Sequence, residues 1–206
     1  MSAQTGAGEG GRAVSHPRET AELEGHGRAE ATLRRAWDSG RLPHAWLLTG
    51  ARGIGKATLA YRFAKFVLAG PANAGADMFG EPATDLDAPA DAAAVHQVAA
   101  ASHPDLYVLE PGRSGILADQ VGGAVQFCHM TAAASPWRVV VVDPAEEMNT
   151  TAANRLLKVL EEPPRHALLL LVSHQPARLL PTIRSRCARL TLPVLDDGIV
   201  RRHLAA

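Results

Sequence analysis

The segment from Gly50 to Thr58 reads GARGIGKAT and nearly matches the phosphate-binding pattern G-x-x-x-x-G-K-[ST]. Gly50, Gly55 and Lys56 occupy fixed positions of the pattern, and Gly53 is a further glycine within it. Backbone N–H groups of such a loop can surround a phosphate at a helix N-terminus, and the lysine adds a positive charge. We therefore predict phosphate binding here, with a glycine-rich turn that holds no ligand as the alternative.

Ala57 departs from this pattern, which requires Ser or Thr at its last position. The missing hydroxyl normally binds Mg²⁺. Thr58 lies one residue further on, about 100° around a helix, and points elsewhere. Because phosphoryl transfer depends on the metal ion, we predict that hydrolysis is impaired and that any ATP binding is weak or absent.

Two further polar groups follow predicted strands. Asp143 ends the apolar run RVVVVDP, where its carboxylate could face a metal ion in the crevice beyond the strand. A helix cap or turn is the alternative for this residue. Ser173 or His174, at the end of ALLLLVS, could hydrogen-bond toward the same crevice or could simply cap the strand. Glu146 and Glu147 are predicted to be solvated charges at a helix start.

Three arginines, Arg184, Arg186 and Arg189, gather in the segment TIRSRCARL. An arginine here could pair with phosphates, including those of a nucleotide on a neighbouring subunit. A solvated basic patch is the alternative.

The elements that position these residues alternate along the chain. A helix is expected over 26–39, and an apolar strand over 44–50 leads into the glycine loop, which a second helix follows. Strands are then expected at 105–111, 138–144, 167–173 and 188–194, with helices at 119–134 and 149–164 and a short helix or turn at 177–187. This alternation predicts an α/β fold with a five-stranded parallel sheet flanked by helices.

Composition restricts the class of protein. The 206 residues carry 21 basic and 21 acidic side chains, so the net charge indicates neither a nucleic-acid nor a membrane binder. The two cysteines, Cys128 and Cys187, cannot form a disulfide framework or, by themselves, a structural zinc site. No apolar run is long enough to span a membrane, and no signal peptide is apparent. We expect a cytoplasmic protein without a membrane partner.

The chain is expected to have three parts. Residues 1–20 read as a disordered tail, 21–195 as the α/β domain, and 196–206 as the start of a truncated C-terminal region. Within the domain, residues 70–102 form an Ala-, Pro- and Asp-rich insertion with five acids and neither Lys nor Arg. We expect this insertion to be mobile or partly helical.

Several segments together resemble the delta-prime subunits of the bacterial DNA polymerase III clamp loader, which belong to the AAA+ superfamily. The resemblance covers roughly residues 18–195 and is carried by LPHAWLLTGARGIGKATLAYRFAKFVLAG, HPDLYVLEP, WRVVVVDPAEEMNTTAANRLLKVLEEPP and LLLLVSHQPARLLPTIRSRCARLTLP. It implies a non-hydrolysing stator in a five-subunit ring that loads the sliding clamp onto primed DNA. The implied partners are the motor gamma/tau and delta subunits, the clamp and primer-template DNA.

The resemblance also implies roles for individual residues. The arginine of the SRC motif, which acts on the ATP of the adjacent motor subunit, corresponds to Arg186; the metal-site aspartate corresponds to Asp143; and the polar sensor corresponds to Ser173. The nucleotide loop corresponds to Gly50, Gly53, Gly55, Lys56, Ala57 and Thr58.

Departures from the family pattern sharpen these expectations. Hydrolysing relatives place Glu directly after the metal-site aspartate, whereas this chain has Pro144, so Ala57 and Pro144 both favour a stator. Many relatives carry a four-cysteine zinc module where residues 70–102 contain no cysteine, so no zinc is expected. The helical lid and collar domains are expected to be absent from this chain. An active AAA+ ATPase, such as a motor subunit or a replication or repair relative, is one alternative. A nucleic-acid-binding adaptor without a nucleotide role is the other.

Overall fold

The structure is a computed structural model that describes residues 16–20, 23–70, 85–196, 198 and 201. Its five strands form one parallel sheet in the order β2-β3-β4-β1-β5. The strands are β1 (Ala45–Thr49), β2 (Leu106–Leu109), β3 (Arg138–Val142), β4 (Ala167–Ser173) and β5 (Ala188–Thr191). The prediction of a five-stranded parallel α/β fold is confirmed.

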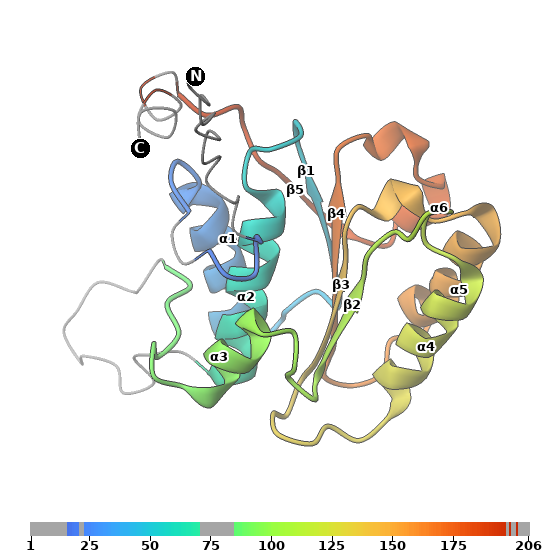
Figure 1. Cartoon of the computed structure of the whole chain (residues 1–206), viewed down its shortest axis with the longest axis horizontal. Coiled ribbons are helices and arrows are strands. Elements are labelled where there is room, and N and C mark those ends of the chain that lie inside the picture. The colour runs from blue at the N-terminus through green and yellow to red at the C-terminus, as the bar shows by residue number, and fades with distance from the viewer. Residues whose placement is uncertain (1–15, 21–22, 71–84, 197, 199–200, 202–206) are drawn as a thin grey trace, which may run out of the picture.

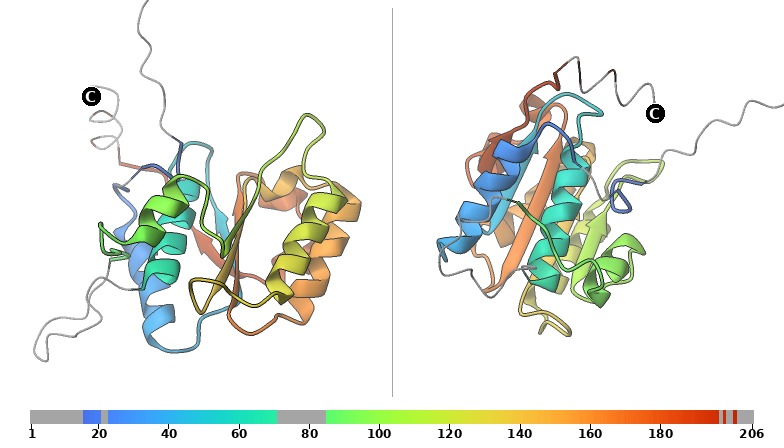
Figure 2. Two further views of the ribbon diagram at one scale, coloured as in Figure 1. Left: turned by 60° about the horizontal axis from the view of Figure 1, so that its bottom comes forward. Right: turned by 90° about the vertical axis from the view of Figure 1, so that its left-hand side faces the viewer.

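Helices cover both faces of the sheet (Figures 1 and 2). One face carries α1 (Gly27–Asp38), α2 (Lys56–Ala69) and α3 (Ala93–Ala99), and the other carries α4 (Ala118–His129), α5 (Thr150–Glu161) and α6 (Pro181–Arg184). Two short 3₁₀ turns, η1 (Ala145–Glu147) and η2 (Pro176–Arg178), follow β3 and β4.

Burial on both faces explains why the strands read as continuous apolar runs. In β3, Val139 and Val141 join the core on the α2 side, whereas Val140 and Val142 join the core on the α5 side. Strand side chains alternate between faces, so a strand that is covered twice must be apolar at every position.

The sheet has a switch point between β1 and β4. The helix that follows β1, α2, lies on one face, whereas the helix that follows β4, α6, lies on the other. Thr49 and Ser173, the last residues of the two strands, are paired in the parallel register. Ligands of open α/β sheets bind at the carboxyl ends of strands beside such a switch point.

The end of α4 corrects the predicted helix over 119–134. The helix stops at His129 because the next segment turns toward β2. There Asp105, which is 2% exposed, accepts hydrogen bonds from the backbone N–H groups of Ala133, Ala134 and Ser135 at 2.7, 2.7 and 2.8 Å. Helical geometry would direct these N–H groups along the helix axis instead.

Helix α5 begins and ends as its sequence indicates. The Asn149 side chain accepts a hydrogen bond from the N–H of Ala152 at 2.8 Å, so Asn149 is the N-cap of this helix. The helix ends at Glu161, just before Pro163, which cannot donate a helical hydrogen bond.

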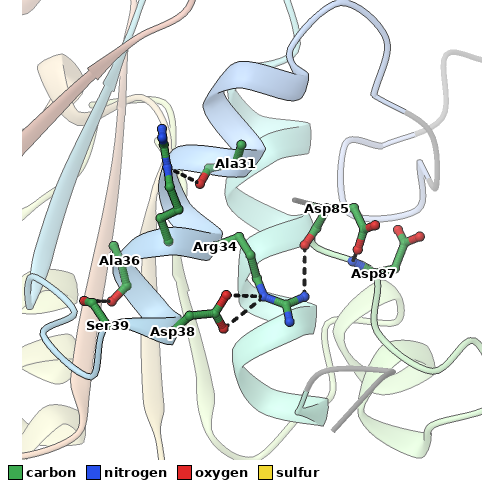
Figure 3. Close-up of polar contacts among 8 residues, drawn as sticks. Ala31, Arg34, Ala36, Asp38, Ser39, Asp85 and Asp87 are labelled. Atoms are coloured by element: carbon green, nitrogen blue, oxygen red, sulfur yellow. Dashed lines mark hydrogen bonds and ion pairs between the residues drawn. The ribbon is translucent and has the colours of Figure 1, made fainter. Parts of the chain in front are cut away.

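The described part of the segment 70–102, for which we predicted an insertion, contains the helix α3 and packs on α2. Its residues 71–84 lie outside the described part of the chain. Beyond them, Leu86 is buried against the α2 side of the core, and so is Val98, which belongs to α3. Arg34 on α1 donates to the backbone oxygen of Asp85 at 3.4 Å while it pairs with Asp38 at 2.9 Å, as Figure 3 shows.

Candidate functional site

The glycine loop adopts positive φ angles, which favour glycine, at all three of its predicted glycines, Gly50, Gly53 and Gly55. Gly50 has φ of 147°, and a Cβ there would lie 2.6 Å from Ile54 Cδ1 and 2.8 Å from the backbone oxygen of Leu192. Gly55, with φ of 96°, is the N-cap of α2. The loop therefore delivers the N-terminus of α2 to the switch point, which is the geometry that a phosphate-binding loop needs.

Lys56 points back into this loop. Its Nζ donates to the backbone oxygen of Ala51 at 2.5 Å, and the residue is only 2% exposed. Burial lowers the pKa of the ammonium, although the nearby carboxylates of Asp143 and Glu146 oppose the shift. One of the three N–H donors that could bind a phosphate is thus engaged within the loop itself.

The two residues after Lys56 offer little side-chain oxygen that could bind a metal ion. Ala57, half-buried in the first turn of α2, has no side-chain oxygen. Thr58 is buried, with 9% of its surface exposed.

A cavity of about 710 Å³ opens at the carboxyl ends of β2, β3 and β4. Four carboxylates and two arginines line it, so its charge is predominantly negative. The lining residues are His16, Pro17, Arg52, Glu110, Pro111, Asp143, Pro144, Glu146, Glu147, His174, Gln175 and Arg178. The structure thus brings Asp143 and the end of β4 to one crevice beside the loop.

The carboxyl group of Asp143 lies near two other acidic side chains of the cavity, Glu110 and Glu146. Burial and the neighbouring Glu110 raise the pKa of its carboxyl group, although Lys56 opposes them. The carboxyl group follows the end of β3 and is close enough to Lys56 for the ammonium to affect its pKa.

Glu146 corrects the expectation of a solvated charge. It is only 8% exposed, and its Oε1 accepts the backbone N–H groups of His174 and Gln175 at 2.8 and 3.1 Å. Burial would raise the pKa of this carboxyl, but the hydroxyl of Ser173 and the N–H donors outweigh it and lower the pKa. Glu146 therefore holds the turn that follows β4. Glu147, in contrast, is exposed, as predicted.

Ser173 lies beneath this turn. It is fully buried, and its hydroxyl lies beside Glu146 without reaching good hydrogen-bond geometry to any described residue. Its neighbour His174 lines the cavity, and burial lowers the pKa of its imidazole.

The chain before α1 also reaches the crevice. His16 Nδ1 accepts the N–H of Arg18 at 3.3 Å, so the ring proton resides on Nε2, which donates to Glu110 Oε1 at 3.2 Å. The ring lies edge-on to Tyr61, with 5.8 Å between centroids. Residues 1–15 of the expected tail lie outside the described residues, whereas 16–20 line or flank the cavity.

Replacing His16 by alanine is expected to speed tryptic cleavage after Arg18 about two- to fivefold. The contact with Glu110 is partly exposed and contributes little free energy, so its loss opens the segment more often without unfolding the domain. Mass spectrometry of the N-terminal fragments over time gives the rate. The control is His129→Ala, at an exposed position that ends α4, and it should cleave at the wild-type rate. Equal rates for both variants would show that this contact does not hold the segment.

Arg186 lies outside the crevice. It follows α6 and precedes β5 by two residues, near the edge where the strands begin, whereas the cavity is at their carboxyl ends. Its Nη2 pairs with Glu161 Oε1 at 2.9 Å, and its Nη1 donates to the backbone oxygen of Thr182 at 3.0 Å. Of the neighbouring arginines, Arg184 is half-buried and Arg189 is exposed on β5.

No group of three or more His, Cys, Asp or Glu side chains within the described residues is arranged to hold a metal ion. Across the same residues, no helix is both long enough and apolar enough to cross a membrane.

Comparison with known proteins identifies the family to which this chain is similar. A family model described as "DNA polymerase III, delta subunit" matches residues 25–196. DNA polymerase III subunit delta' of Pseudomonas aeruginosa is 47% identical over 154 residues, which cover 73% of this chain and 43% of that protein. The corresponding Bacillus subtilis subunit is 31% identical over 174 residues, which cover 84% of this chain and 49% of that protein.

This chain belongs to the delta-prime family of DNA polymerase III subunits. It spans less than half the length of these two delta-prime relatives. Its fold is shared with a DNA polymerase III gamma subunit-related protein from Thermotoga maritima, with a TM-score of 0.59, 21% identity, and coverage of 82% of this chain and 47% of that one. The predicted resemblance and the AAA+-type fold are therefore confirmed.

The sequence did not identify His16 or Glu110 as residues of the site. It also did not predict that the Lys56 side chain points back into the loop. A signal for Glu110 was present, because it directly follows a strand parallel to the one that ends at Asp143. The carboxyl ends of adjacent parallel strands meet at one sheet edge. The contact of His16 depends on the path of the chain before α1, which carries no periodic pattern.

Proposed function

We propose that this chain is a non-hydrolysing, stator-type subunit of a DNA polymerase III clamp loader. Membership of the delta-prime family supports a place in clamp loading during DNA replication. The proposed partners are gamma/tau and delta subunits and, through the assembled complex, the sliding clamp and primer-template DNA. Residues 21–195 would form its AAA+ domain.

The observation that carries the non-hydrolysing role is the bond from Lys56 Nζ to the backbone oxygen of Ala51. Ala57 supplies no metal-binding hydroxyl beside it, and Pro144 stands directly after Asp143 where a glutamate would activate water. The nearest buried glutamate, Glu146, already accepts two backbone N–H groups. One of the three N–H donors of the loop lysine is thus already engaged, Ala57 offers no metal-binding hydroxyl, and no glutamate directly follows Asp143.

Any nucleotide would be held weakly by the same loop. The backbone of Gly50, Gly53 and Gly55 and the start of α2 at Lys56, Ala57 and Thr58 would surround the phosphates. Asp143 would lie on the far side of the crevice, and Ser173 would act only from beneath the turn that follows β4. We propose no zinc in this function.

The proposed role in catalysis belongs to Arg186, acting on the ATP of an adjacent motor subunit. The guanidinium is partly exposed, with 36% of the side chain accessible, and both of its internal contacts leave donors for a partner. This role makes the chain a contributor to an enzyme complex without ATPase activity of its own.

The isolated chain is expected to show no Mg²⁺-dependent ATPase activity above that of Lys56→Ala, because each chemical requirement is missing. A coupled assay for ADP release measures turnover, and a fluorescent ATP analogue titrated with and without Mg²⁺ measures binding. Lys158→Ala, at an exposed lysine of α5, is the control for a lost charge. Turnover that persists in Lys158→Ala and vanishes in Lys56→Ala would establish an active AAA+ ATPase instead.

A further inference from the structure

Two segments that stand apart in the sequence meet at one ion pair. Glu161 is the last residue of α5, in the segment LLKVLEEPP, and Arg186 lies in the segment TIRSRC after α6. Their side chains are joined by Glu161 Oε1 and Arg186 Nη2 at 2.9 Å. The guanidinium is also held from α6, since Nη1 donates to the oxygen of Thr182 at 3.0 Å.

These two contacts orient the guanidinium but occupy only some of its N–H donors. A guanidinium carries five N–H donors in one plane, and contacts through two different nitrogens fix the direction of that plane. Within the described residues, Arg186 uses one donor of Nη2 and one donor of Nη1 for these contacts. The remaining donors can bind phosphate oxygens while both internal contacts stay in place.

We propose that Glu161 is a positioning residue for Arg186, which holds the guanidinium ready to bind the nucleotide of a neighbouring subunit. The inference rests on the proposed action of Arg186 in trans. An arginine side chain loses rotamer freedom when it binds, and an ion pair that already restricts the rotamers reduces that loss.

The negative charge of Glu161 also acts against phosphate binding, so two effects compete. The carboxylate side chain is 49% exposed, and water and salt screen its repulsion of a more distant phosphate. The contact with Arg186, at 2.9 Å, is direct. We therefore expect the orienting effect of Glu161 on the Arg186 guanidinium to exceed its repulsion of the phosphate.

The test uses a clamp loader reconstituted from purified complete subunits, in which this subunit carries Glu161→Ala or Glu161→Gln. Glu161→Ala should lower the kcat of the DNA- and clamp-stimulated ATPase about threefold, as expected for loss of a partly exposed ion pair, and should leave KM for ATP unchanged. Glu161→Gln should recover most of the activity, because its amide oxygen still accepts from Arg186. The matched control is Glu162→Ala, at the next residue, which is exposed.

The same substitution in an Arg186→Ala background separates positioning from a general structural effect. There, Glu161→Ala should cause no further loss, because the group that it positions is gone. An equal loss in both backgrounds, or an unchanged or raised kcat in the Glu161→Ala loader, would overturn the positioning role. If Arg186→Ala itself leaves the ATPase unchanged, the proposed action in trans fails together with this inference. A normal loss in Arg186→Ala without an effect of Glu161→Ala defeats this inference alone.

Discussion

A clamp loader that carries Arg186→Ala in this subunit is expected to hydrolyse ATP about tenfold more slowly and to load clamps correspondingly slowly. An arginine supplied in trans stabilises the charge that develops on the transferred phosphoryl group, and its loss costs several orders of magnitude at a single site. In the proposed complex the other nucleotide sites would keep their own arginines, so the expected effect on the whole complex is smaller. Steady-state ATPase activity and clamp loading onto primed DNA measure it.

The isolated Arg186→Ala subunit should keep its thermal midpoint. The ion pair with Glu161 is partly exposed on both sides, and such pairs contribute little to stability. Arg189→Ala, which removes an exposed arginine of β5, is the matched control and should leave the ATPase rate of the loader intact. Unchanged ATPase activity in the Arg186→Ala loader would exclude the proposed action in trans.

Asp105→Ala is expected to destabilise the fold by about 3 kcal/mol, the largest effect on stability that we predict. The carboxylate of Asp105 accepts three backbone N–H groups, and the substitution leaves these donors without a protein partner in a turn where Ser135 is buried and Ala133 and Ala134 are exposed. Urea denaturation of the wild type and the variant at pH 7 measures the difference in unfolding free energy.

The cost of Asp105→Ala should depend on pH in a defined direction. Burial alone would raise the pKa of Asp105, but the three N–H donors and the nearby His103 lower it below the ordinary aspartate value. A carboxyl whose pKa is lower in the folded state stabilises the protein above its unfolded pKa, about 3.9, and loses this contribution as pH falls through the folded value. The difference between wild type and variant should therefore be complete at pH 6 and shrink below about pH 4.

An exposed aspartate provides the comparison. Asp91→Ala, in the segment before α3, should leave the urea midpoint unchanged at both pH values. A loss of stability that is equal for Asp105→Ala and Asp91→Ala, or one that grows as the pH falls, would contradict the role assigned to the Asp105 carboxylate.

The sheet could be predicted from the sequence because its physical requirement is visible there. Strands that are buried on both faces must be apolar at every position, and the runs ending at Asp143 and Ser173 meet this requirement. The glycine loop was equally visible, since its backbone angles exclude other residues at Gly50 and Gly55. The apolar runs and the glycine positions can each be recognised within a short continuous stretch of the sequence.

The parts that could not be predicted depend on contacts between distant segments. Glu146 has the type and spacing of a solvated residue at a helix start, yet it is buried because the turn after β4 presents two N–H groups to it. The helix α4 ends early because Asp105, more than twenty residues upstream, captures the N–H groups that would have continued it. Neither partner can be read from the local pattern.

The bond between Lys56 and Ala51 gives the proposed weak nucleotide binding a quantitative form. If nucleotide binds only those molecules in which the ammonium has left the carbonyl oxygen and faces Asp143 and Glu146, its affinity depends on their fraction. The apparent dissociation constant equals the intrinsic constant divided by that fraction, so a loop open in about 1% of molecules binds about 100-fold more weakly. Under this proposal the chain retains the backbone of a phosphate-binding loop and still binds nucleotide weakly.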